Sequence, residues 1–193
     1  MDAVWLGALA VLVMLGFDLA NLGRRVILKR AAPFIAGGFF FAAIYLILRQ
    51  PPAISMPRWA VVVGITLSLA GIILLVYSLA IDIPFQSTYL APDASSRLIT
   101  TGTYALTRHP GVLWLTVFLI GLLIANRSLA LFVAIPVWLG LDVLHVWLQD
   151  RYFFPKQFPD YRAYQQRTPM LIPNRSSIDR CAQTLPWCYR RAP

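Results

Sequence analysis

The sequence predicts an all-α membrane protein, a polytopic helical bundle of about five transmembrane helices. Of its 193 residues, 59% are hydrophobic and 13% are charged, and the mean hydropathy is +0.66. Soluble domains carry about 25% charged residues, so this composition points to lipid as the surrounding medium. The second observation is that long apolar stretches recur along the chain, and the third is that the basic residues gather between alternate stretches. A chain of this length forms one domain.

Five apolar stretches are candidate helices. A helix needs roughly 20 residues to cross about 30 Å of hydrocarbon, so the first, third and fifth stretches are long enough. The second is at the lower limit, and the fourth, with 15 residues, reaches only about 22 Å at 1.5 Å per residue. The stretches are Ala3–Leu22, Ala31–Leu48, Trp59–Ile81, Gly111–Ala125 and Leu129–Leu148.

The segments between the helices support this division. The start, Met1-Asp2-Ala3, lacks the basic region of a signal peptide, so we expect the first helix to be retained. Gln50-Pro51-Pro52 and Met56-Pro57 prevent the second and third helices from fusing. The short turn Asn126-Arg127-Ser128 makes the last two helices a tight hairpin.

The basic residues predict the orientation in the membrane. Arg49, Arg58 and Arg127 fall on one side, and the other fourteen fall on the opposite side. The positive-inside rule places the fourteen in the cytoplasm, hence an inner-membrane protein with its C-terminal segment inside. Anionic membrane lipids are the expected counter-charge for the net charge of +9, and no nucleic acid is expected as a partner. The fourteen are Arg24, Arg25, Lys29, Arg30, Arg97, Arg108, Arg151, Lys156, Arg162, Arg167, Arg175, Arg180, Arg190 and Arg191.

Few polar residues interrupt the helices. Asp18 is expected to be an interfacial carboxylate that faces Arg24 or Arg25. Asp142, His145 and Gln149 share one face of the fifth helix, where they either pair with a neighbouring helix or line a polar pocket. Glycines at 37, 38, 64 and 71 permit close helix contact without requiring it, so the oligomeric state stays open.

The cysteines and histidines predict no metal site. Cys181 and Cys188 are the two cysteines, and His109 and His145 are far from them in the sequence. A metal site needs more ligands at closer spacing. Two free thiols in a basic tail are the expected state in a reducing cytoplasm.

The densest group of chemically useful residues lies before the fourth apolar stretch, in Thr101–Pro110. It places a glycine turn, a tyrosine, an arginine and a histidine where a helix enters the membrane, and charged groups at such places are functional candidates. After the fifth helix come Asp150 and then three aromatics three residues apart, namely Phe158, Tyr161 and Tyr164. These aromatics are equally typical of an amphipathic helix that lies on the membrane surface.

The pattern Gly102-x-Tyr104-x-x-x-Arg108-His109-Pro110, a helical hairpin, an acid, F-x-x-Y-x-x-Y and Pro169 resembles the isoprenylcysteine carboxyl methyltransferase and phospholipid methyltransferase superfamily. The resemblance covers about residues 98–173. It implies an integral membrane enzyme that binds S-adenosylmethionine at the cytoplasmic face and methylates lipophilic acceptors. It also implies a division into a three-helix region (1–81), a methyltransferase-like region (82–173) and a basic tail (174–193).

The resemblance assigns roles by position. Arg108 and Asp150 are the expected catalytic residues, and the expected cofactor-binding residues are Gly102, Tyr104, His109, Pro110, Asp150, Tyr161 and Tyr164. The family usually has two glutamates where this chain has Asp150 and Arg151, and Tyr and Gly where it has Val112 and Trp114.

Three functions follow as alternatives. The first is S-adenosylmethionine-dependent methyl transfer to a lipophilic or small carboxyl, thiol or amine acceptor. It requires no metal and no covalent enzyme intermediate, since the protein aligns donor and acceptor. The second is a membrane reductase with a nicotinamide cofactor, and the third is a non-catalytic accessory protein that retains the fold. The sequence carries no code for the acceptor.

Overall fold

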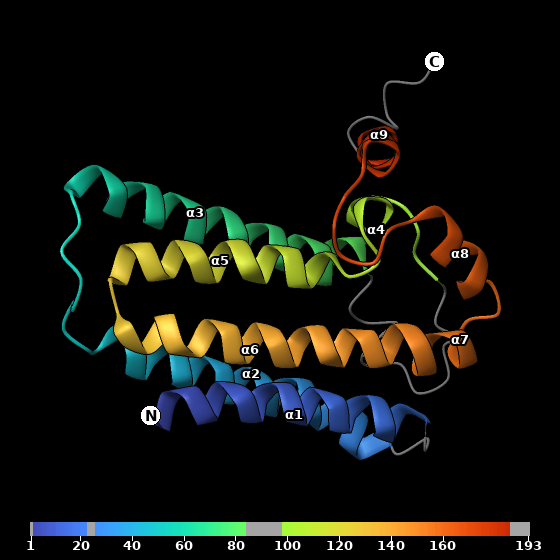
Figure 1. Cartoon of the computed structure of the whole chain (residues 1–193). Helices are drawn as coiled ribbons and strands as arrows, with labels where there is room; N and C mark the ends of the chain where they lie inside the picture. Colours follow the sequence, from blue (N-terminus) through green and yellow to red (C-terminus); the bar gives the residue numbers. More distant parts are fainter. Residues whose placement is uncertain (1, 23–25, 84–97, 186–193) are drawn as a thin grey trace. The chain divides into compact units, whose positions relative to one another are not determined.

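A computed structural model of the chain describes residues 2–22, 26–83 and 98–185, and all regular structure within them is helical (Figure 1). The all-α prediction is therefore confirmed. Two short π-helical turns continue longer helices, η1 after α3 and η3 after α6. The elements are α1 (Asp2–Leu22), α2 (Val26–Leu48), α3 (Arg58–Val76), η1 (Tyr77–Asp82), α4 (Thr103–Leu106), α5 (Pro110–Asn126), α6 (Leu129–Leu148), η3 (Gln149–Phe153), α7 (Phe154–Gln157), α8 (Tyr161–Arg167) and α9 (Arg175–Thr184).

Each of the five predicted apolar helices is found as a helix with similar bounds. Within the described residues, three helical runs are long and apolar enough to cross a membrane, namely Ala31–Leu48, Arg58–Asp82 and Leu129–Gln157. Helix α5 is apolar but shorter, as the sequence predicted for the fourth stretch. The first stretch forms α1, with 21 residues. Its crossing of the membrane stays a prediction, because the side chains of residues 19–30 lie outside the described part.

The chain divides into two compact units. Unit 1 comprises Met1–Ile72 and Leu115–Trp147, and unit 2 comprises Ile73–Trp114 and Leu148–Pro193. The three-part division made from the sequence stays a prediction.

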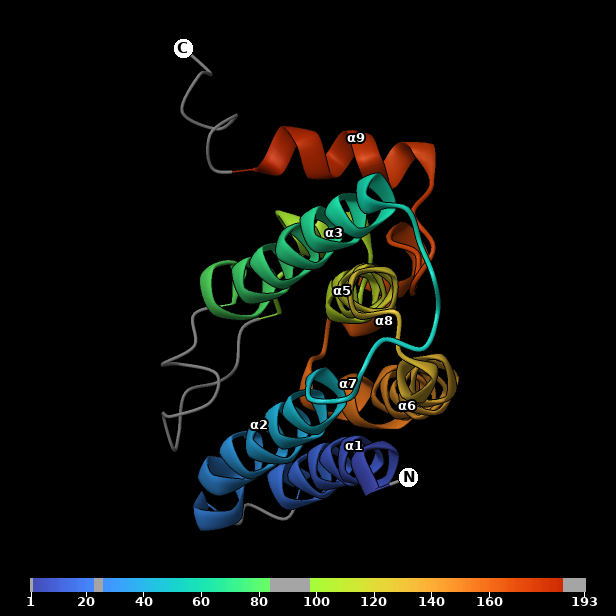
Figure 2. The ribbon, with the colours of Figure 1, turned by 90° about the vertical axis from the view of Figure 1, so that its left-hand side faces the viewer.

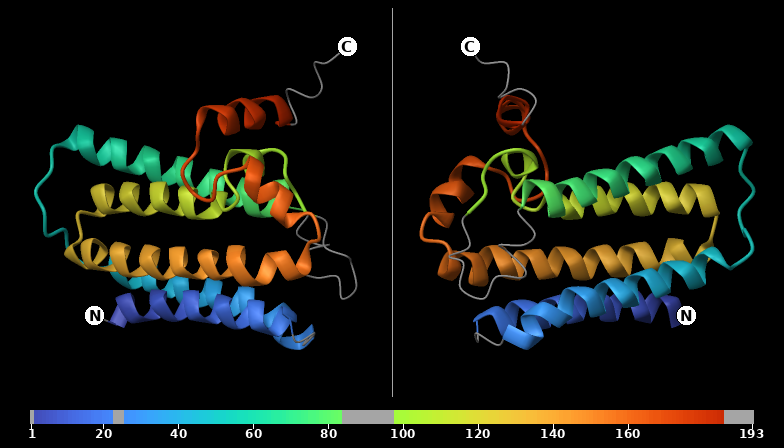
Figure 3. Two further views of the ribbon diagram at one scale, coloured as in Figure 1. Left: turned by 45° about the vertical axis from the view of Figure 1, so that its right-hand side comes forward. Right: turned by 180° about the vertical axis from the view of Figure 1, so that it is seen from behind.

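Unit 1 is built around the indole of Trp138 on α6. This side chain is 1% exposed, and its Nε1 donates a hydrogen bond of 2.8 Å to the carbonyl of Val4. Helices α1 and α2 run beside each other and beside α6 (Figures 2 and 3). Residues of α1, α2, α5 and α6 complete the core: Ala3, Val4, Ala43, Ile44, Ile47, Leu119, Leu131, Ala134 and Trp138.

Glycines bring α3 and α5 into backbone contact within unit 1. A Cβ at Gly64 would lie 2.6 Å from the amide nitrogen of Ala125, and one at Gly121 would lie 2.4 Å from that of Ser68. Helices surrounded by lipid associate through such close packing, because no difference in hydrophobicity drives them together. Gly64 and Gly71, whose spacing permitted close contact, therefore make it with α5.

One buried polar pair joins α1 to α6. The Nε2 atom of His145 lies 2.6 Å from Oδ2 of Asp18, and both residues are buried. Asp18 was expected to face Arg24 or Arg25, whose side chains lie outside the described part. That contact stays a prediction, and the structure gives Asp18 a partner 127 residues away. An unpaired carboxylate at membrane depth is costly, so this pair stabilises the contact between the two helices. Of the two readings of the polar face on α6, the structure therefore supports pairing with a neighbouring helix for His145.

Candidate functional site

The sequence string that ends in Arg108-His109-Pro110 is held by backbone hydrogen bonds in unit 2. The amide of Arg108 donates to the carbonyl of Pro169 (2.9 Å), and the amide of His109 donates to that of Met170 (3.2 Å). Pro110, which is buried, is the first residue of α5, a position where its missing N–H costs nothing. The string is therefore paired with the segment that follows α8.

Gly102 has a structural reason to be glycine. Its φ is +62° and its ψ is −134°, a region that residues with a side chain avoid. A Cβ there would lie 2.7 Å from both carboxylate oxygens of Asp82. That carboxylate accepts hydrogen bonds from the amide (2.7 Å) and the hydroxyl (2.5 Å) of Thr103, the first residue of α4. Backbone conformation and this close approach account for Gly102 without a cofactor.

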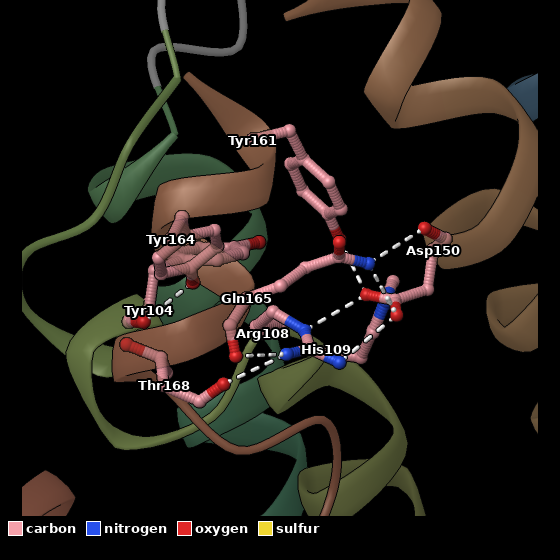
Figure 4. Close-up of polar contacts among 8 residues, drawn as sticks. All are labelled: Tyr104, Arg108, His109, Asp150, Tyr161, Tyr164, Gln165 and Thr168. Carbon is pink, nitrogen blue, oxygen red and sulfur yellow. Dashed lines mark hydrogen bonds and ion pairs between the residues drawn. The ribbon is translucent and has the colours of Figure 1, made fainter.

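The carboxylate of Asp150 is the centre of the polar cluster (Figure 4). Nε and Nη2 of Arg108 donate to its Oδ1 (2.8 Å) and Oδ2 (2.9 Å) in a bidentate pair. The hydroxyl of Tyr161 donates to Oδ1 (2.6 Å), and Nε2 of the Gln165 side chain donates to Oδ2 (3.0 Å). A carboxylate has about four lone-pair positions, so these four donors occupy its capacity.

The remaining nitrogen of the Arg108 guanidinium ties the cluster to the end of α8. Its Nη1 donates to the carbonyls of Gln165 and Thr168, each at 2.9 Å. The Arg108 side chain is 10% exposed and that of Asp150 is 11% exposed. The pair is therefore a buried, bidentate ion pair in which each guanidinium nitrogen and both carboxylate oxygens are bonded, which is the favourable case for such a pair.

His109 lies between this carboxylate and an aromatic row. Its Nε2 is 3.5 Å from Oδ1 of Asp150. Its ring stacks on that of Phe154, with centroids 5.8 Å apart and an angle of 13° between the planes. Phe154 also contacts Phe158 and Tyr161 edge to face. An aromatic row beside an imidazole suits a planar or cationic ligand group.

The two tyrosines of α8 are held as hydrogen-bond donors. The hydroxyl of Tyr164 donates to the carbonyl of Tyr104 (2.6 Å). Burial, and next the hydrogen bond to Asp150, raise the pKa of Tyr161 above its ordinary value. Burial also raises the pKa of Tyr164. Both phenols therefore stay protonated at neutral pH.

The structure brings the expected site residues together in unit 2, over 60 residues of sequence. Arg108, His109, Asp150 and Tyr161 share one cluster, and Tyr164 joins it to Tyr104. Gly102 and Pro110 fix the backbone at the two ends of the string. A cofactor that contacts the Asp150 carboxylate directly, as the resemblance implies, would have to displace one of the groups that now donate hydrogen bonds to it. Whether these residues bind a cofactor stays a prediction.

Two members of the cluster were missed by sequence reasoning. Gln165 lies four residues after Tyr161, hence on the same face of α8, and it also donates to the carbonyl of Asp150 (2.9 Å). Phe154 stacks on His109. The helical spacing from Tyr161 was the available signal for Gln165. Among the described residues, no group of three or more His, Cys, Asp and Glu side chains is arranged to hold a metal ion.

Compared with known protein families, the chain matches one family over a segment that contains the candidate site. Residues 35–168 match the model of a family described as protein of unknown function (DUF1295). A curated relative, the nickel-cobalt-cadmium resistance protein NccN of Alcaligenes xylosoxydans xylosoxydans, is 28% identical over 88 residues. That match covers 46% of this chain and 41% of the relative, so the chain spans less than half of the relative's length. No solved structure matches.

Proposed function

The chain belongs to the DUF1295 family, and from this premise we propose that it is a membrane methyltransferase that uses S-adenosylmethionine. Its acceptor would be a lipophilic or small molecule with a carboxyl, thiol or amine group. The observation that supports this most directly is the polar cluster. The Gly102–Pro110 string, Asp150 and the Phe158–Tyr164 segment meet in unit 2, as the resemblance to membrane methyltransferases requires.

The proposed reaction is an in-line displacement. A lone pair of the acceptor forms a bond to the methyl carbon while the carbon–sulfur bond breaks, and its electron pair returns to sulfur. A carboxylate acceptor becomes a neutral ester and a thiolate becomes a thioether, while an amine loses a proton after transfer. The protein supplies alignment and exclusion of water, and effective-molarity measurements put the contribution of alignment at up to about 7–11 kcal/mol.

In this proposal the residues divide into two groups. His109 and the aromatic row of Phe154 and Phe158 are the candidates for direct contact, since imidazole can hold a carboxylate and aromatic faces suit a sulfonium or an adenine. Arg108 and Asp150 act as positioning residues, because their polar atoms already bind one another and α8. Tyr161 and Gln165 support that arrangement.

The Asp150 carboxylate already accepts four hydrogen bonds from the protein, and this favours a second candidate, a non-catalytic accessory protein. A carboxylate that is occupied by four donors is also what a purely structural lock would show. The two candidates differ in ligand binding, because the accessory protein would bind neither S-adenosylmethionine nor a nicotinamide cofactor.

The test is calorimetry on the purified full chain in detergent, with S-adenosylmethionine and NADPH titrated separately. We expect binding of S-adenosylmethionine, and His109→Ala should weaken it by about 1.5–3 kcal/mol if the imidazole makes a hydrogen bond to a charged group. Arg162→Ala, which changes an exposed cation on α8, is the matched control. Binding of NADPH alone would support a reductase. Binding of neither would support the accessory protein.

A further inference from the structure

The loop between α8 and α9 exposes an isoleucine in unit 2. At 83%, Ile172 is the most exposed large apolar side chain in the described part of the chain. It lies in residues 168–174, which we call the α8–α9 loop. Ile178, near the start of α9, is 51% exposed. Exposed apolar side chains that lie near one another in a structure mark a contact with a membrane or with another molecule.

Hydrogen bonds fix this loop at both of its ends. At the first end, the carbonyls of Pro169 and Met170 accept from the amides of Arg108 (2.9 Å) and His109 (3.2 Å). At the second end, Asn174 caps α9: its Oδ1 accepts from the amide of Ser177 (2.9 Å), and its own amide donates to the Ser177 hydroxyl (3.0 Å). The exposure of Ile172 therefore belongs to a loop whose backbone is held on either side.

The bond between His109 and Met170 also places the loop relative to the membrane. His109 directly precedes Pro110, the first residue of the apolar helix α5. Ile172 is the second residue after Met170, so the Cα atoms of the two lie within about 7 Å of each other. Ile172 is therefore close to the point at which α5 begins.

The far end of α9 is tied to the end of another apolar helical run. The amide of Gly102 donates to the hydroxyl of Thr184, the last residue of α9 (3.0 Å). The next residue, Thr103, bonds the carboxylate of Asp82, where the run Arg58–Asp82 ends. Between these ties, α9 packs beside α4 (Figure 1). Both ends of the segment that carries Ile172 and Ile178 are thus bonded next to the ends of apolar helices.

The aromatic side chains of α8 leave this membrane contact to other residues. The sequence allowed α8 to lie on the membrane surface through its tyrosines, but Tyr161 is 1% exposed and Tyr164 is 6% exposed. Their hydroxyls bond Asp150 and the carbonyl of Tyr104. In the described chain after α8, the exposed large apolar side chains are those of Ile172 and Ile178.

We propose that the α8–α9 loop is a membrane anchor, which inserts Ile172 into the edge of the hydrocarbon of the leaflet where α5 begins. The exposed Arg175 then lies among the headgroups, where a guanidinium pairs with phosphate. Because the loop bonds the backbone of Arg108 and His109, the lipid would steady that string from outside the protein. The anchor does not depend on whether the site transfers a methyl group.

Electron paramagnetic resonance on a nitroxide at residue 172 tests the depth of the loop. The full chain, with Cys181 and Cys188 replaced by serine, would carry Ile172→Cys and be placed in phosphatidylcholine nanodiscs. Oxygen concentrates in hydrocarbon, whereas a charged nickel chelate stays in water. We expect the label to collide more with oxygen than with nickel. Ile120→Cys, at an exposed residue of α5, is the hydrocarbon reference, and Gln166→Cys, at an exposed residue of α8, is the aqueous reference.

A second measurement needs no label. Ile172→Asn removes the apolar side chain and leaves the backbone bonds of the loop possible. In nanodiscs, the amides of Arg108 and His109 should exchange hydrogen faster in this variant than in wild type, because the loop to which they donate has lost its anchor. Gln166→Asn, a change of similar size at an exposed polar residue, should leave their exchange unchanged.

Three results would overturn the anchor. More collisions with nickel than with oxygen would place residue 172 in water. Few collisions with either reagent would show that a protein surface, such as a second copy of this chain, covers it. Exchange of the Arg108 and His109 amides at the wild-type rate in Ile172→Asn would show that lipid does not hold the loop.

Discussion

The guanidinium of Arg108 joins two segments of unit 2. It pairs with Asp150 through two nitrogens and reaches the carbonyls of Gln165 and Thr168 with the third. No other side chain offers this planar fork of donors, and a lysine would supply a single point charge. The arginine of the Arg108-His109-Pro110 string is thus accounted for by its bonds within the protein.

Arg108→Ala should lower the free energy of unfolding by about 3–5 kcal/mol, because it leaves the buried Asp150 carboxylate without its cation. Thermal unfolding in detergent would measure this. Arg108→Lys should recover only part of the loss. Arg162→Ala should leave the unfolding temperature unchanged, and a similar loss in that control would assign the effect to general charge instead.

Tyr161→Phe tests the shortest contact of Asp150 that does not involve a charged donor. The ring stays, but the hydroxyl that lies 2.6 Å from Oδ1 is lost. A hydrogen bond to a charged group contributes about 1.5–3 kcal/mol, and chemical unfolding should show a loss of this size. A change below a few tenths of a kcal/mol would mean that Asp150 is held well enough by its other donors.

The raised pKa of Tyr161 predicts how stability depends on alkaline pH. In the unfolded chain the phenol ionises near pH 10, whereas in the folded chain it keeps its proton. Its contribution to stability is therefore complete below about pH 10 and declines as the pH rises above that value. The unfolding temperature of wild type should fall more steeply than that of Tyr161→Phe between about pH 10 and 11.5. Parallel curves for the two proteins would contradict the prediction.

At the scale of elements, the short helix α4 depends on the turn before it. The amide of Gly102 donates a hydrogen bond to the hydroxyl of Thr184 in α9 (3.0 Å). The amide of Thr103 donates one to the carboxylate of Asp82. This arrangement connects the end of η1, α4 and α9 within unit 2. The sequence string therefore begins in a turn that three elements define.

Gly102→Ala should destabilise unit 2 by about 1–3 kcal/mol, because its backbone conformation excludes side chains and the new Cβ would meet Asp82. Hydrogen exchange of the Thr103–Leu106 amides would show the local opening. Gly16→Ala, which has nothing within 4 Å of its Cβ, is the control. Unchanged protection in Gly102→Ala would show that the turn relaxes without cost.

The contact between α3 and α5 has its own test. Gly121→Ala places a methyl group 2.4 Å from the amide nitrogen of Ser68, so the helices must separate. We expect a loss of about 1–3 kcal/mol, the usual cost of overpacking, in a chemical unfolding experiment. Gly140→Ala on α6 meets nothing within 4 Å and should be neutral or slightly stabilising. Equal effects of the two changes would remove close packing as the cause.

At the scale of the whole molecule, the charge bias of fourteen to three predicts the orientation in the membrane. In a chain with Cys181 and Cys188 replaced by serine, Ser55→Cys should react with an impermeant thiol reagent added outside intact cells. Ser176→Cys should react only after lysis. Both positions are exposed, so burial would not mask either result. The opposite pattern would reverse the assigned orientation.

Much of the helical fold could be predicted from the sequence by itself. Apolar composition and segment length are properties of each stretch alone, so the bounds of α6 and the short fourth helix followed directly. The region of the candidate site also followed, since Arg108, His109, Asp150 and Tyr161 were each singled out from their sequence surroundings and the structure brings them together.

Only the tertiary structure decided which groups pair. Asp18 contacts His145 across 127 residues, Asp150 binds Arg108 across 42, and the glycines of α3 meet α5. Such pairs depend on how separate helices pack, and spacing within one helix carries no information about a partner on another. Asp150 shows what this means for function. The sequence predicted that its carboxylate contacts a cofactor, whereas in the packed structure it accepts hydrogen bonds from four donor groups of the protein itself.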